Sequence, residues 1–419
     1  MKLRIITPIC AAIVIIQLQA CGGLGYVVDG VPLPANTSSR SGDEASTLAG
    51  TWVGRWGGTL KHILVVQSVS TDGNAKVVYA IGDEPRFNIQ RTWYNLNGTV
   101  SGNALQIRGD GFSVRYQLTR HKKLLAVYQS GPAISTAVLT RHELTEIVKP
   151  GATPNWDTGQ KTSVQTALLE NDQPVRFEVV IYKPPGDGPF PLAVVNHGST
   201  GRGNKPRRFT RTYSDAALAE LLNERGWLVA FPQRRGRGKS DGLYDEGFAA
   251  DRTLGYTCEP KRSLAGAERG LEDIAAVVTA LRQRTDVKDA PVFMSGQSRG
   301  GALAVAYAGR YPEQVGPVMN LVGGWLGDLC SSSASVNETL FEMGAASGKP
   351  MLWIYGEQDP FYSIEHSRQR FAAFQQAGGQ GKFIAIKVPG GNGHRVMQAP
   401  SLWLNELDEY LKKVTDTAN

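Results

Sequence analysis

Short apolar runs alternate with polar residues between about residues 48 and 144. The runs lie at 63–66, 76–80, 104–107, 113–116 and 124–128. Turn signals such as Asn97-Gly98 separate them. Short strands with turns between them are typical of antiparallel sheets. The pattern predicts a small all-β sandwich or barrel domain over residues 48–148. Its Trp52, Trp56 and Trp93 are expected in the core or over an edge, and a ligand site lined by them is the alternative.

The hydrophobic period changes after residue 160. Two strand-like runs, 163–169 and 176–182, come first. The strand candidates that follow are 192–195, 227–231, 292–295, 318–322, 352–355 and 383–388. The helix candidates between and after them are 214–225, 264–284, 300–310, 364–377 and 401–413. Alternating strands and helices predict an α/β domain over 161–415, with a mostly parallel sheet and helices on both faces.

Three segments show neither the alternation of apolar and polar residues typical of strands nor the apolar period typical of helices. Residues 1–20 combine a charged start at Lys2 and Arg4 with an apolar run, which is the composition of an export signal peptide. Residues 21–47 are rich in Gly, Pro, Ser and Asn and are predicted to form a flexible tether. Residues 149–160 contain two prolines and two glycines and are predicted to be a linker between the two domains.

The apolar run ends in Leu18-Gln19-Ala20-Cys21. This string resembles the lipobox of bacterial lipoproteins. The resemblance implies cleavage before Cys21, acylation of Cys21 and attachment to a lipid bilayer in the bacterial cell envelope, facing the periplasm. A secreted protein with an ordinary signal peptide is the alternative.

Net charge and cysteine content indicate which partners and which covalent links to expect. The net charge of +7 is mild, and the densest basic stretch, at 234–239, lacks interleaved aromatic residues, so no nucleic-acid partner is expected. With Cys10 in the signal and Cys21 lipidated, Cys258 and Cys330 remain. An oxidising compartment favours a disulfide between them, which we expect to brace a pocket rim, and two unpaired thiols are the alternative.

A candidate nucleophile, Ser298, lies in the pentapeptide Gly-Gln-Ser-Arg-Gly at 296–300. Chance supplies such a string fairly often in a chain with 48 glycines, so its context matters. An apolar strand runs into it from 291 and a helix of small residues leaves it from 301. A strand, a sharp turn and a helix form the nucleophile elbow of serine hydrolases, and the helix start favours nearby negative charge.

A serine hydroxyl needs a general base, and the base needs an acid that orients it. Asp359 and His394 follow Ser298 in that order, each on a loop after a predicted strand. Asp328 and Glu357 are the rival acids. Among the histidines, His366 opens a predicted helix, so it is interpreted as a solvated helix-end residue.

The turn at 197–199 reads His-Gly-Ser and follows the strand at 192–195. It resembles the oxyanion loop of α/β hydrolases. The backbone N–H groups of Ser199, or Gly198, and of Arg299 are therefore expected to face the developing oxyanion. His197 is interpreted as a structural residue that packs the turn.

Residues 160–415 resemble the dienelactone-hydrolase-like and prolyl-oligopeptidase-like branch of the α/β hydrolases. The matching elements, in order, are His-Gly at 197–198, the Arg-Gly-rich stretch at 235–242, the pentapeptide at 296–300, Gly-x-x-Asp-Pro at 356–360 and Gly-His at 393–394. True dienelactone hydrolases use a cysteine nucleophile where this chain has Ser298. The resemblance therefore implies a serine hydrolase without specifying a dienelactone substrate.

The sequence predicts hydrolysis of small carboxylic esters through an acyl-enzyme on Ser298, with no cofactor and no metal. A serine peptidase is the first alternative, because the machinery is the same. A non-catalytic envelope lipoprotein that binds a ligand through its β-module is the second, and the presence of a complete Ser, Asp and His set disfavours it.

Overall fold

The computed structural model describes residues 24–28, 31–34, 37, 47–84, 89–142, 159–201, 203–388 and 391–416. The chain divides into two compact units. The first runs to Thr158 and includes Asp215–Glu220, and the second contains the remainder from Gly159. The predicted signal at 1–20, Cys21 and most of the predicted linker at 149–160 lie outside the described residues, so the domain boundaries stay predictions.

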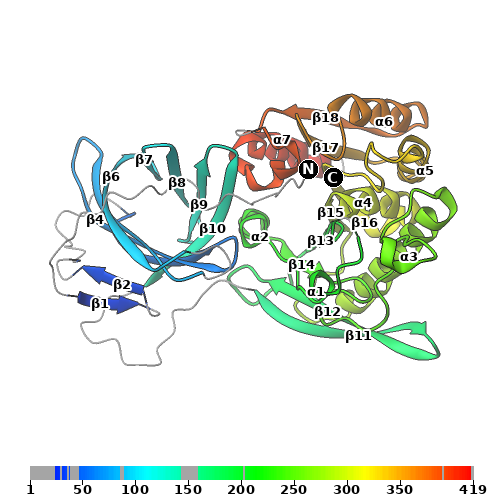
Figure 1. The fold of residues 1–419 in the computed structure, drawn as a ribbon, viewed down its shortest axis with the longest axis horizontal. Coiled ribbons are helices and arrows are strands. Elements are labelled where there is room, and N and C mark those ends of the chain that lie inside the picture. The colour runs from blue at the N-terminus through cyan, green and yellow to red at the C-terminus, as the bar shows by residue number, and fades with distance from the viewer. Residues whose placement is uncertain are drawn as a thin grey trace. The chain divides into compact units, whose positions relative to one another are not determined.

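The first unit contains a closed antiparallel barrel with the strand order β10-β3-β4-β5-β6-β7-β8-β9 (Figure 1). Its strands are β3 (Gly50–Trp56), β4 (Leu60–Val69), β5 (Asn74–Ile81), β6 (Thr92–Ser101), β7 (Ala104–Gly109), β8 (Phe112–Leu118), β9 (Leu124–Ser130) and β10 (Ala133–His142). The predicted all-β domain is thus a barrel. Closure leaves none of these strands as a free edge.

Alternation along the barrel strands separates two apolar clusters. One face contributes Trp52, Trp56 and Leu64 to the larger cluster, which also contains Tyr79 and Tyr116. The intervening residues belong to a second cluster, described below. Because successive side chains of a strand point to opposite faces, the larger cluster is the barrel interior. Of the three tryptophans expected in the core or over an edge, two therefore lie in the barrel interior. The third, Trp93, packs on the second cluster.

Part of the predicted flexible tether is folded. Strands β1 (Leu24–Val28) and β2 (Val31–Pro34) pair as an antiparallel hairpin. Val28, Val31 and Leu33 are buried against the outward-facing residues of β3–β5. The prediction of a tether over all of 21–47 was wrong because four or five apolar residues among many small polar ones form a strand when a partner surface buries them.

The second unit has an eight-stranded sheet with the order β11-β12-β14-β13-β15-β16-β17-β18. The strands are β11 (Gln160–Glu170), β12 (Gln173–Tyr182), β13 (Leu192–Asn196), β14 (Leu228–Pro232), β15 (Val292–Gln297), β16 (Val315–Leu321), β17 (Pro350–Gly356) and β18 (Gln380–Ile386). The β11–β12 and β12–β14 pairs are antiparallel, and the others are parallel. The sequence predicted each of these strands, with small shifts of the ends.

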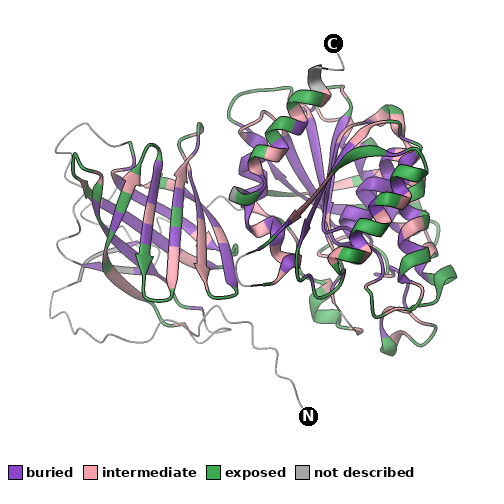
Figure 2. Cartoon of the chain, turned by 90° about the horizontal axis from the view of Figure 1, so that it is seen from above, coloured by how far each residue is buried: buried purple, intermediate pink, exposed green. Residues whose placement is uncertain are grey.

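Helices cover both faces of this sheet, and Figure 2 shows its strands buried between them. The described helices are α1 (Pro206–Phe209), α2 (Ala216–Asn223), α3 (Pro260–Arg282), α4 (Arg299–Arg310), α5 (Ser333–Ala345), α6 (Ile364–Gln376) and α7 (Leu404–Asp416), and the first residues of α2 group with the first unit. Short 3-10 turns lie at Arg252–Leu254, Pro312–Gln314, Gly393–Gln398 and Pro400–Leu402. Helix α5 was not predicted. None of the described helices combines the length and the apolar character needed to cross a bilayer.

The loops after β13, β15, β16, β17 and β18 all leave the same edge of the sheet, because these strands are parallel. Ligands bind at this edge in open α/β sheets. Each residue predicted to act in catalysis lies on one of these loops or at the start of α4.

Candidate active site

Ser298 lies on the sharp turn between β15 and α4, with φ 56° and ψ −123°. A non-glycine residue with positive φ is strained and persists only where the surroundings hold it. The Ser298 N–H donates to Leu321 O at 3.0 Å, and its carbonyl accepts the N–H of Gly324 at 3.1 Å. These bonds hold the strained turn in the conformation of a nucleophile elbow.

The two glycines of the pentapeptide are needed for close backbone approach. A Cβ on Gly296 would lie 2.3 Å from the carbonyl oxygen of Gly300. A Cβ on Gly300 would lie 2.1 Å from the carbonyl oxygen of Asn196, at the end of β13. The spacing Gly-x-Ser-x-Gly thus follows from the packing of the elbow against itself and against β13.

Asp359 and His394 meet through a hydrogen bond of 2.8 Å between Oδ2 and Nδ1. The other carboxylate oxygen of Asp359 accepts the backbone N–H groups of Phe361 at 2.8 Å and Tyr362 at 3.2 Å. Only 8% of Asp359 is exposed. A buried carboxylate that accepts three hydrogen bonds can hold one tautomer and one orientation of the imidazole.

The rival acids do not contact His394. Asp328 Oδ2 accepts the N–H of Ser363 at 2.7 Å, and its Oδ1 lies 3.4 Å from Nδ1 of His366. Glu357 is exposed. His366 is half-buried, with Nε2 3.1 Å from Nδ2 of Asn337, so its interpretation as a solvated residue was wrong. Burial is also the main cause that lowers its pKa. The structure thus separates an Asp359–His394 pair from an Asp328–His366 pair.

Ser298 and His394 line one cavity of about 690 Å³. No hydrogen bond joins their side chains in the described part of the chain. The Ser298 hydroxyl lies 3.4 Å from the hydroxyl of Tyr362, which donates to Gly324 O at 2.5 Å. Apo catalytic contacts are often longer than those of the reacting complex. A side-chain bond from Gln297 Nε2 to the His394 carbonyl, 2.9 Å long, ties the histidine loop to the elbow.

Tyr362 is a site residue that sequence reasoning missed. It is buried beside Ser298, and burial raises its pKa to about 12. Its single proton is donated to the Gly324 carbonyl, so its oxygen is free to accept the Ser298 proton in the resting state. The only signal in the sequence is its place three residues after Asp359.

The turn at 197–199 lies against the nucleophile. A Cβ on Gly198 would lie 3.1 Å from Cβ and 3.6 Å from Oγ of Ser298. His197 Nε2 accepts the N–H of Arg234 at 3.2 Å, so Nδ1 carries the proton and donates to Gly198 O at 2.8 Å. In a trans peptide the C=O and the following N–H point in opposite directions. The bond from His197 therefore turns the Ser199 N–H away from the His197 ring.

His197 is neutral. Burial and the Arg234 and Arg237 guanidinium groups hold its pKa well below 6.5. A neutral ring is required for Nε2 to accept a hydrogen bond. This agrees with the structural role predicted for His197.

A buried network centred on Glu246 supports the turn from two sides. On one side, Glu246 binds Arg234 Nε at 2.6 Å, and Arg234 NH2 donates to His197 O at 2.9 Å. Burial alone would raise the pKa of Glu246, but Arg234, with Arg299 and Arg237, holds it below its usual value. Glu246 is therefore a carboxylate that anchors the residues behind the turn.

The other side of the network runs through two tyrosines. Tyr244 donates its proton to Glu246 Oε2 at 2.9 Å, so Tyr256 donates to the Tyr244 oxygen at 2.7 Å. The Tyr256 oxygen in turn accepts the Thr200 N–H at 3.1 Å and lies 3.0 Å from the Thr200 hydroxyl. A chain of hydroxyl groups thus connects Glu246 to Thr200, the residue that follows the predicted oxyanion donor Ser199.

Arg299 begins α4, and the first N–H groups of a helix have no partner within it. Its side chain is buried. The guanidinium donates to Trp325 O at 3.0 Å and to Glu246 O at 2.6 Å, and it lies 3.8 and 4.4 Å from the ring centroids of Tyr256 and Trp325. The residue after the nucleophile therefore fixes two of the loops around the cavity.

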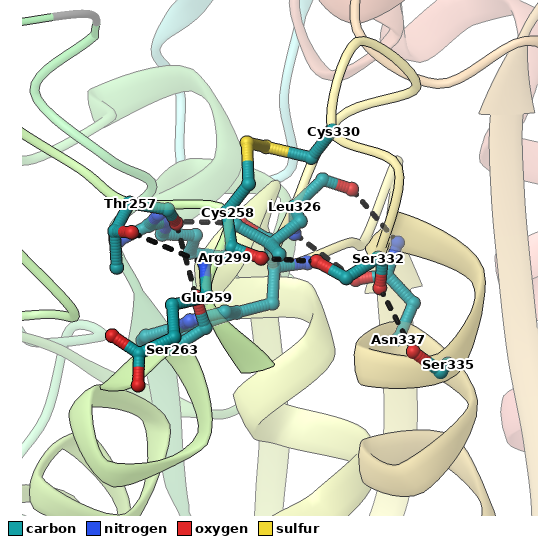
Figure 3. Close-up of a disulfide and its surroundings, with 11 residues drawn as sticks. Thr257, Cys258, Glu259, Ser263, Arg299, Leu326, Cys330, Ser332, Ser335 and Asn337 are labelled. Carbon is teal, nitrogen blue, oxygen red and sulfur yellow. Dashed lines mark hydrogen bonds between the residues drawn. A yellow bond between two sulfur atoms is a disulfide. The ribbon is translucent and has the colours of Figure 1, made fainter. Parts of the chain in front are cut away.

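Cys258 and Cys330 form a disulfide, as predicted. Both cysteines line the cavity, one before α3 and the other after β16. The Ser332 hydroxyl also bonds to the carbonyl of Cys258, and Figure 3 shows both connections between the two loops. The predicted position of the disulfide on the pocket rim agrees with this geometry. The described residues contain no cluster of ligands suited to a metal ion.

Comparisons with known proteins agree with a hydrolase. Residues 210–328 match the family model described as serine aminopeptidase, S33. This segment includes Ser298 and ends before Asp359 and His394. No curated protein matches the chain.

Several solved structures are similar to part of this chain. Est1E from Butyrivibrio proteoclasticus with ferulic acid bound is 18% identical, with a TM-score of 0.40, over 57% of this chain and 96% of that one. The esterase Pf2001 from Pyrococcus furiosus is 16% identical, with a TM-score of 0.42, over 65% of this chain and 99% of that one. A predicted CIB-like hydrolase from Thermoplasma acidophilum is 16% identical, with a TM-score of 0.39, over 61% and 98%.

The fold of the second unit is identified by its own strand order, elbow and loop positions. A mostly parallel sheet whose fifth strand leads into a strained serine, followed along the chain by an aspartate and a histidine, is the arrangement of the α/β hydrolases. The second unit of this protein has the α/β-hydrolase fold.

Proposed function

We propose that the protein is a serine hydrolase of carboxylic esters, with Ser298 as nucleophile, His394 as general base and Asp359 as the group that orients His394. The observation that carries the proposal is the Asp359–His394 hydrogen bond of 2.8 Å beside a serine on a nucleophile elbow, in one cavity. The Ser298 oxygen attacks the ester carbonyl while its proton passes to His394.

The remaining steps conserve atoms and charge. His394 returns the proton to the leaving oxygen, the C–O bond breaks and an alcohol departs, which leaves an acyl group on Ser298. Water, deprotonated by His394, then attacks the acyl carbonyl and releases the carboxylic acid and Ser298. The products are one acid and one alcohol from one ester and one water.

The negative charge of each tetrahedral intermediate falls to the N–H groups of Ser199 and Arg299. Support comes from the contact of Gly198 with Ser298 and from the position of Arg299 as the first residue of α4. We assign Glu246 and Tyr256 as positioning residues, because their network anchors the turn that carries Ser199. They touch the turn or its supports rather than the reacting atoms.

Labelling with a fluorophosphonate and hydrolysis of nitrophenyl acetate test this function. Wild type is expected to be labelled and to hydrolyse the ester, and Ser298→Ala to lose labelling and at least about 10³-fold in kcat. Labelling that persists in Ser298→Ala would show that another residue is the nucleophile. Absence of both activities in wild type would favour a non-catalytic binding lipoprotein.

A serine peptidase is the second candidate. The match of residues 210–328 to the serine aminopeptidase family favours it. The two candidates share every catalytic residue, so the difference lies in the substrate. Amino-acid nitroanilides hydrolysed with higher kcat/KM than nitrophenyl esters of similar size would identify a peptidase.

We also propose that the protein is exported and lipid-anchored through Cys21. The Cys258–Cys330 disulfide supports export, because such bonds persist in oxidising compartments. Incorporation of a tagged fatty acid into wild type, and its loss in Cys21→Ala, is the expected result.

A further inference from the structure

Exposed leucines gather at the mouth of the candidate active site. Leu254 is 70% exposed and Leu329 is 78% exposed, and both line the cavity that contains Ser298. Three other leucines of the described residues are exposed to a smaller extent and do not line this cavity: Leu169 (56%), Leu243 (54%) and Leu402 (42%). Isolated exposed leucines are ordinary, whereas several at one cavity mouth mark a place where an apolar group binds.

The two leucines are carried by segments that the disulfide joins. Leu254 precedes Cys258 by four residues, and Leu329 is next to Cys330. We call Leu254, Cys258, Cys330 and Leu329 the collar. The disulfide adds apolar sulfur surface to the cavity wall and limits how far the two leucines can separate. Figure 3 shows the bond spanning the gap between the two loops.

The same two loops are tied a second time, closer to Ser298. The guanidinium of Arg299 lies between the rings of Tyr256 and Trp325 and donates to the Trp325 carbonyl. Asn337 also accepts the N–H groups of Trp325 and Leu326 through its side-chain oxygen at 2.7 and 3.1 Å. A surface held in place before the substrate arrives binds it at a smaller entropic cost.

The position of the collar relative to the base indicates which part of an ester it meets. His394 must reach the leaving oxygen, and the Phe361 ring packs on the His394 ring with centroids 4.7 Å apart. The 254–258 segment instead adjoins the oxyanion turn, since Tyr256 bonds to Thr200. The leaving group therefore lies toward Phe361, and the Leu254 side of the collar is left for the acyl group. The Leu329 side adjoins Phe361, because the N–H of Asp328 donates to the Phe361 carbonyl at 2.8 Å.

We propose that the collar is the acyl subsite and that the protein prefers esters of apolar acyl chains of medium length over acetyl esters. This inference rests on the proposed ester hydrolysis. An acyl chain that reaches the collar covers leucine surface that is otherwise exposed to water, and each methylene that is buried adds to transition-state binding. An acetyl group has no methylene with which to cover this surface.

The test compares nitrophenyl octanoate with nitrophenyl acetate, both below their micelle-forming concentrations, on the full chain. The two esters share a leaving group, so their ratio of kcat/KM reports only the acyl group. The variant Leu254→Ser/Leu329→Ser is expected to lower kcat/KM for the octanoate about tenfold and for the acetate less than twofold. Leu169→Ser, which removes an exposed leucine that does not line the cavity, is expected to leave both values unchanged.

A second variant tests whether the disulfide holds the two leucines of the collar in place. Cys258→Ala/Cys330→Ala is expected to lower the octanoate-to-acetate ratio at least threefold while fluorophosphonate labelling is retained, because the catalytic residues do not depend on the bond. If the cysteine variant is not labelled, because it does not fold, the collar is tested by Leu254→Ser/Leu329→Ser, which keeps the disulfide. An unchanged ratio in Leu254→Ser/Leu329→Ser overturns the collar. Absence of hydrolysis of both esters by wild type instead contradicts the ester hydrolysis itself.

Discussion

The barrel and the α/β-hydrolase unit each enclose a histidine, and the two histidines are held in opposite ways. His62 lies in the barrel interior, where Nδ1 donates to Ala80 O at 2.9 Å and Nε2 accepts the Tyr116 hydroxyl proton at 2.9 Å. The Trp56 ring stacks on it at 4.9 Å. Burial lowers its pKa to about 3, so the ring stays neutral.

His394 has a carboxylate on one ring nitrogen and a cavity on the other side. In the proposed mechanism Asp359 stabilises the positive charge that His394 acquires from Ser298, and the His394 side chain is 18% exposed. Neither ring nitrogen of His62 is available in this way, because both already have neutral partners. A histidine with neutral partners on both ring nitrogens is a packing residue. A histidine with a carboxylate on one nitrogen and a cavity beside the other is suited to act as a base.

Of the changes that test this comparison, replacing the Asp359 carboxylate by an amide is expected to have the largest effect on activity. Asp359→Asn leaves a hydrogen-bonding group of the same size but no charge to stabilise the imidazolium. We expect kcat for nitrophenyl acetate to fall about 10³- to 10⁴-fold with KM nearly unchanged. The matched control is Asp328→Asn, which alters the pair with His366 and should change kcat less than threefold. Comparable losses in both variants would contradict the assignment of Asp359.

The pH dependence of barrel stability is the next largest expected effect. Between pH 6.5 and about 3 the unfolded chain binds a proton on His62 that the folded barrel does not bind. Stability is therefore complete above pH 6.5 and falls as the pH drops, by about 1.4 kcal/mol per unit for this one group. Hydrogen exchange of β4 and β5 in the full chain, followed against urea from pH 6.5 to 5, measures the slope.

His62→Leu provides the control for that slope. It removes the titrating group and leaves the Ala80 carbonyl and the Tyr116 hydroxyl without their partner, at a cost of about 1–3 kcal/mol. The variant barrel should be less stable at pH 7 and nearly independent of pH between 6.5 and 5. Ester hydrolysis should be unaffected. A slope that survives the substitution would show that other groups cause it.

The smallest expected effect compares two hydrogen-bonded tyrosine hydroxyls, one beside the candidate site and one in the barrel. Tyr256→Phe removes the bond to Thr200 while the ring can still stack on a guanidinium, and we expect kcat to fall about tenfold, as for one hydrogen bond of roughly 1–1.5 kcal/mol. KM should change less than twofold, and affinity for a boronic acid analogue of the tetrahedral intermediate should fall with kcat. Tyr116→Phe, in the barrel, should lower stability and leave kcat unchanged.

Tyr410→Phe is the control within the same unit. Its hydroxyl accepts the Val318 N–H at 2.7 Å and donates to Pro350 O at 2.9 Å, away from the turn at 197–199. It should lower the melting temperature without changing kcat. If Tyr410→Phe and Tyr256→Phe lower kcat equally, the effect of Tyr256 is one of stability and not of positioning.

Much of the fold could be predicted from local patterns. Alternation and turn residues identified most barrel strands, and each strand of the large sheet was predicted, because a buried strand places an apolar run between polar turns. The hairpin of β1 and β2 was missed, since its few apolar residues become a strand only on the outer surface of the barrel. Helix α5 was missed because its buried face includes Ser333, Asn337 and Gly344, which interrupt the apolar period.

The candidate site divides in the same way. Ser298 was predictable because its constraint is local: the strand, the two glycines and the helix are consecutive in the chain. Tyr362, Tyr256 and Glu246 had no such signal. Their importance comes from hydrogen bonds to Ser298, Thr200 and Arg234, and no short motif contains both members of any of these pairs.

The sequence by itself determined the elbow and the order of serine, aspartate and histidine, and it favoured a disulfide between Cys258 and Cys330 without excluding two free thiols. Only the tertiary structure decided that Asp359, and not Asp328, holds His394, that a network from Glu246 supports the turn at 197–199, and that Leu254 and Leu329 flank the disulfide at one cavity mouth. The physical reason is the distance along the chain between the residues that interact. Backbone conformation depends on adjacent residues, whereas a hydrogen bond or an apolar contact depends on ångström-scale distances between loops that are far apart in the chain.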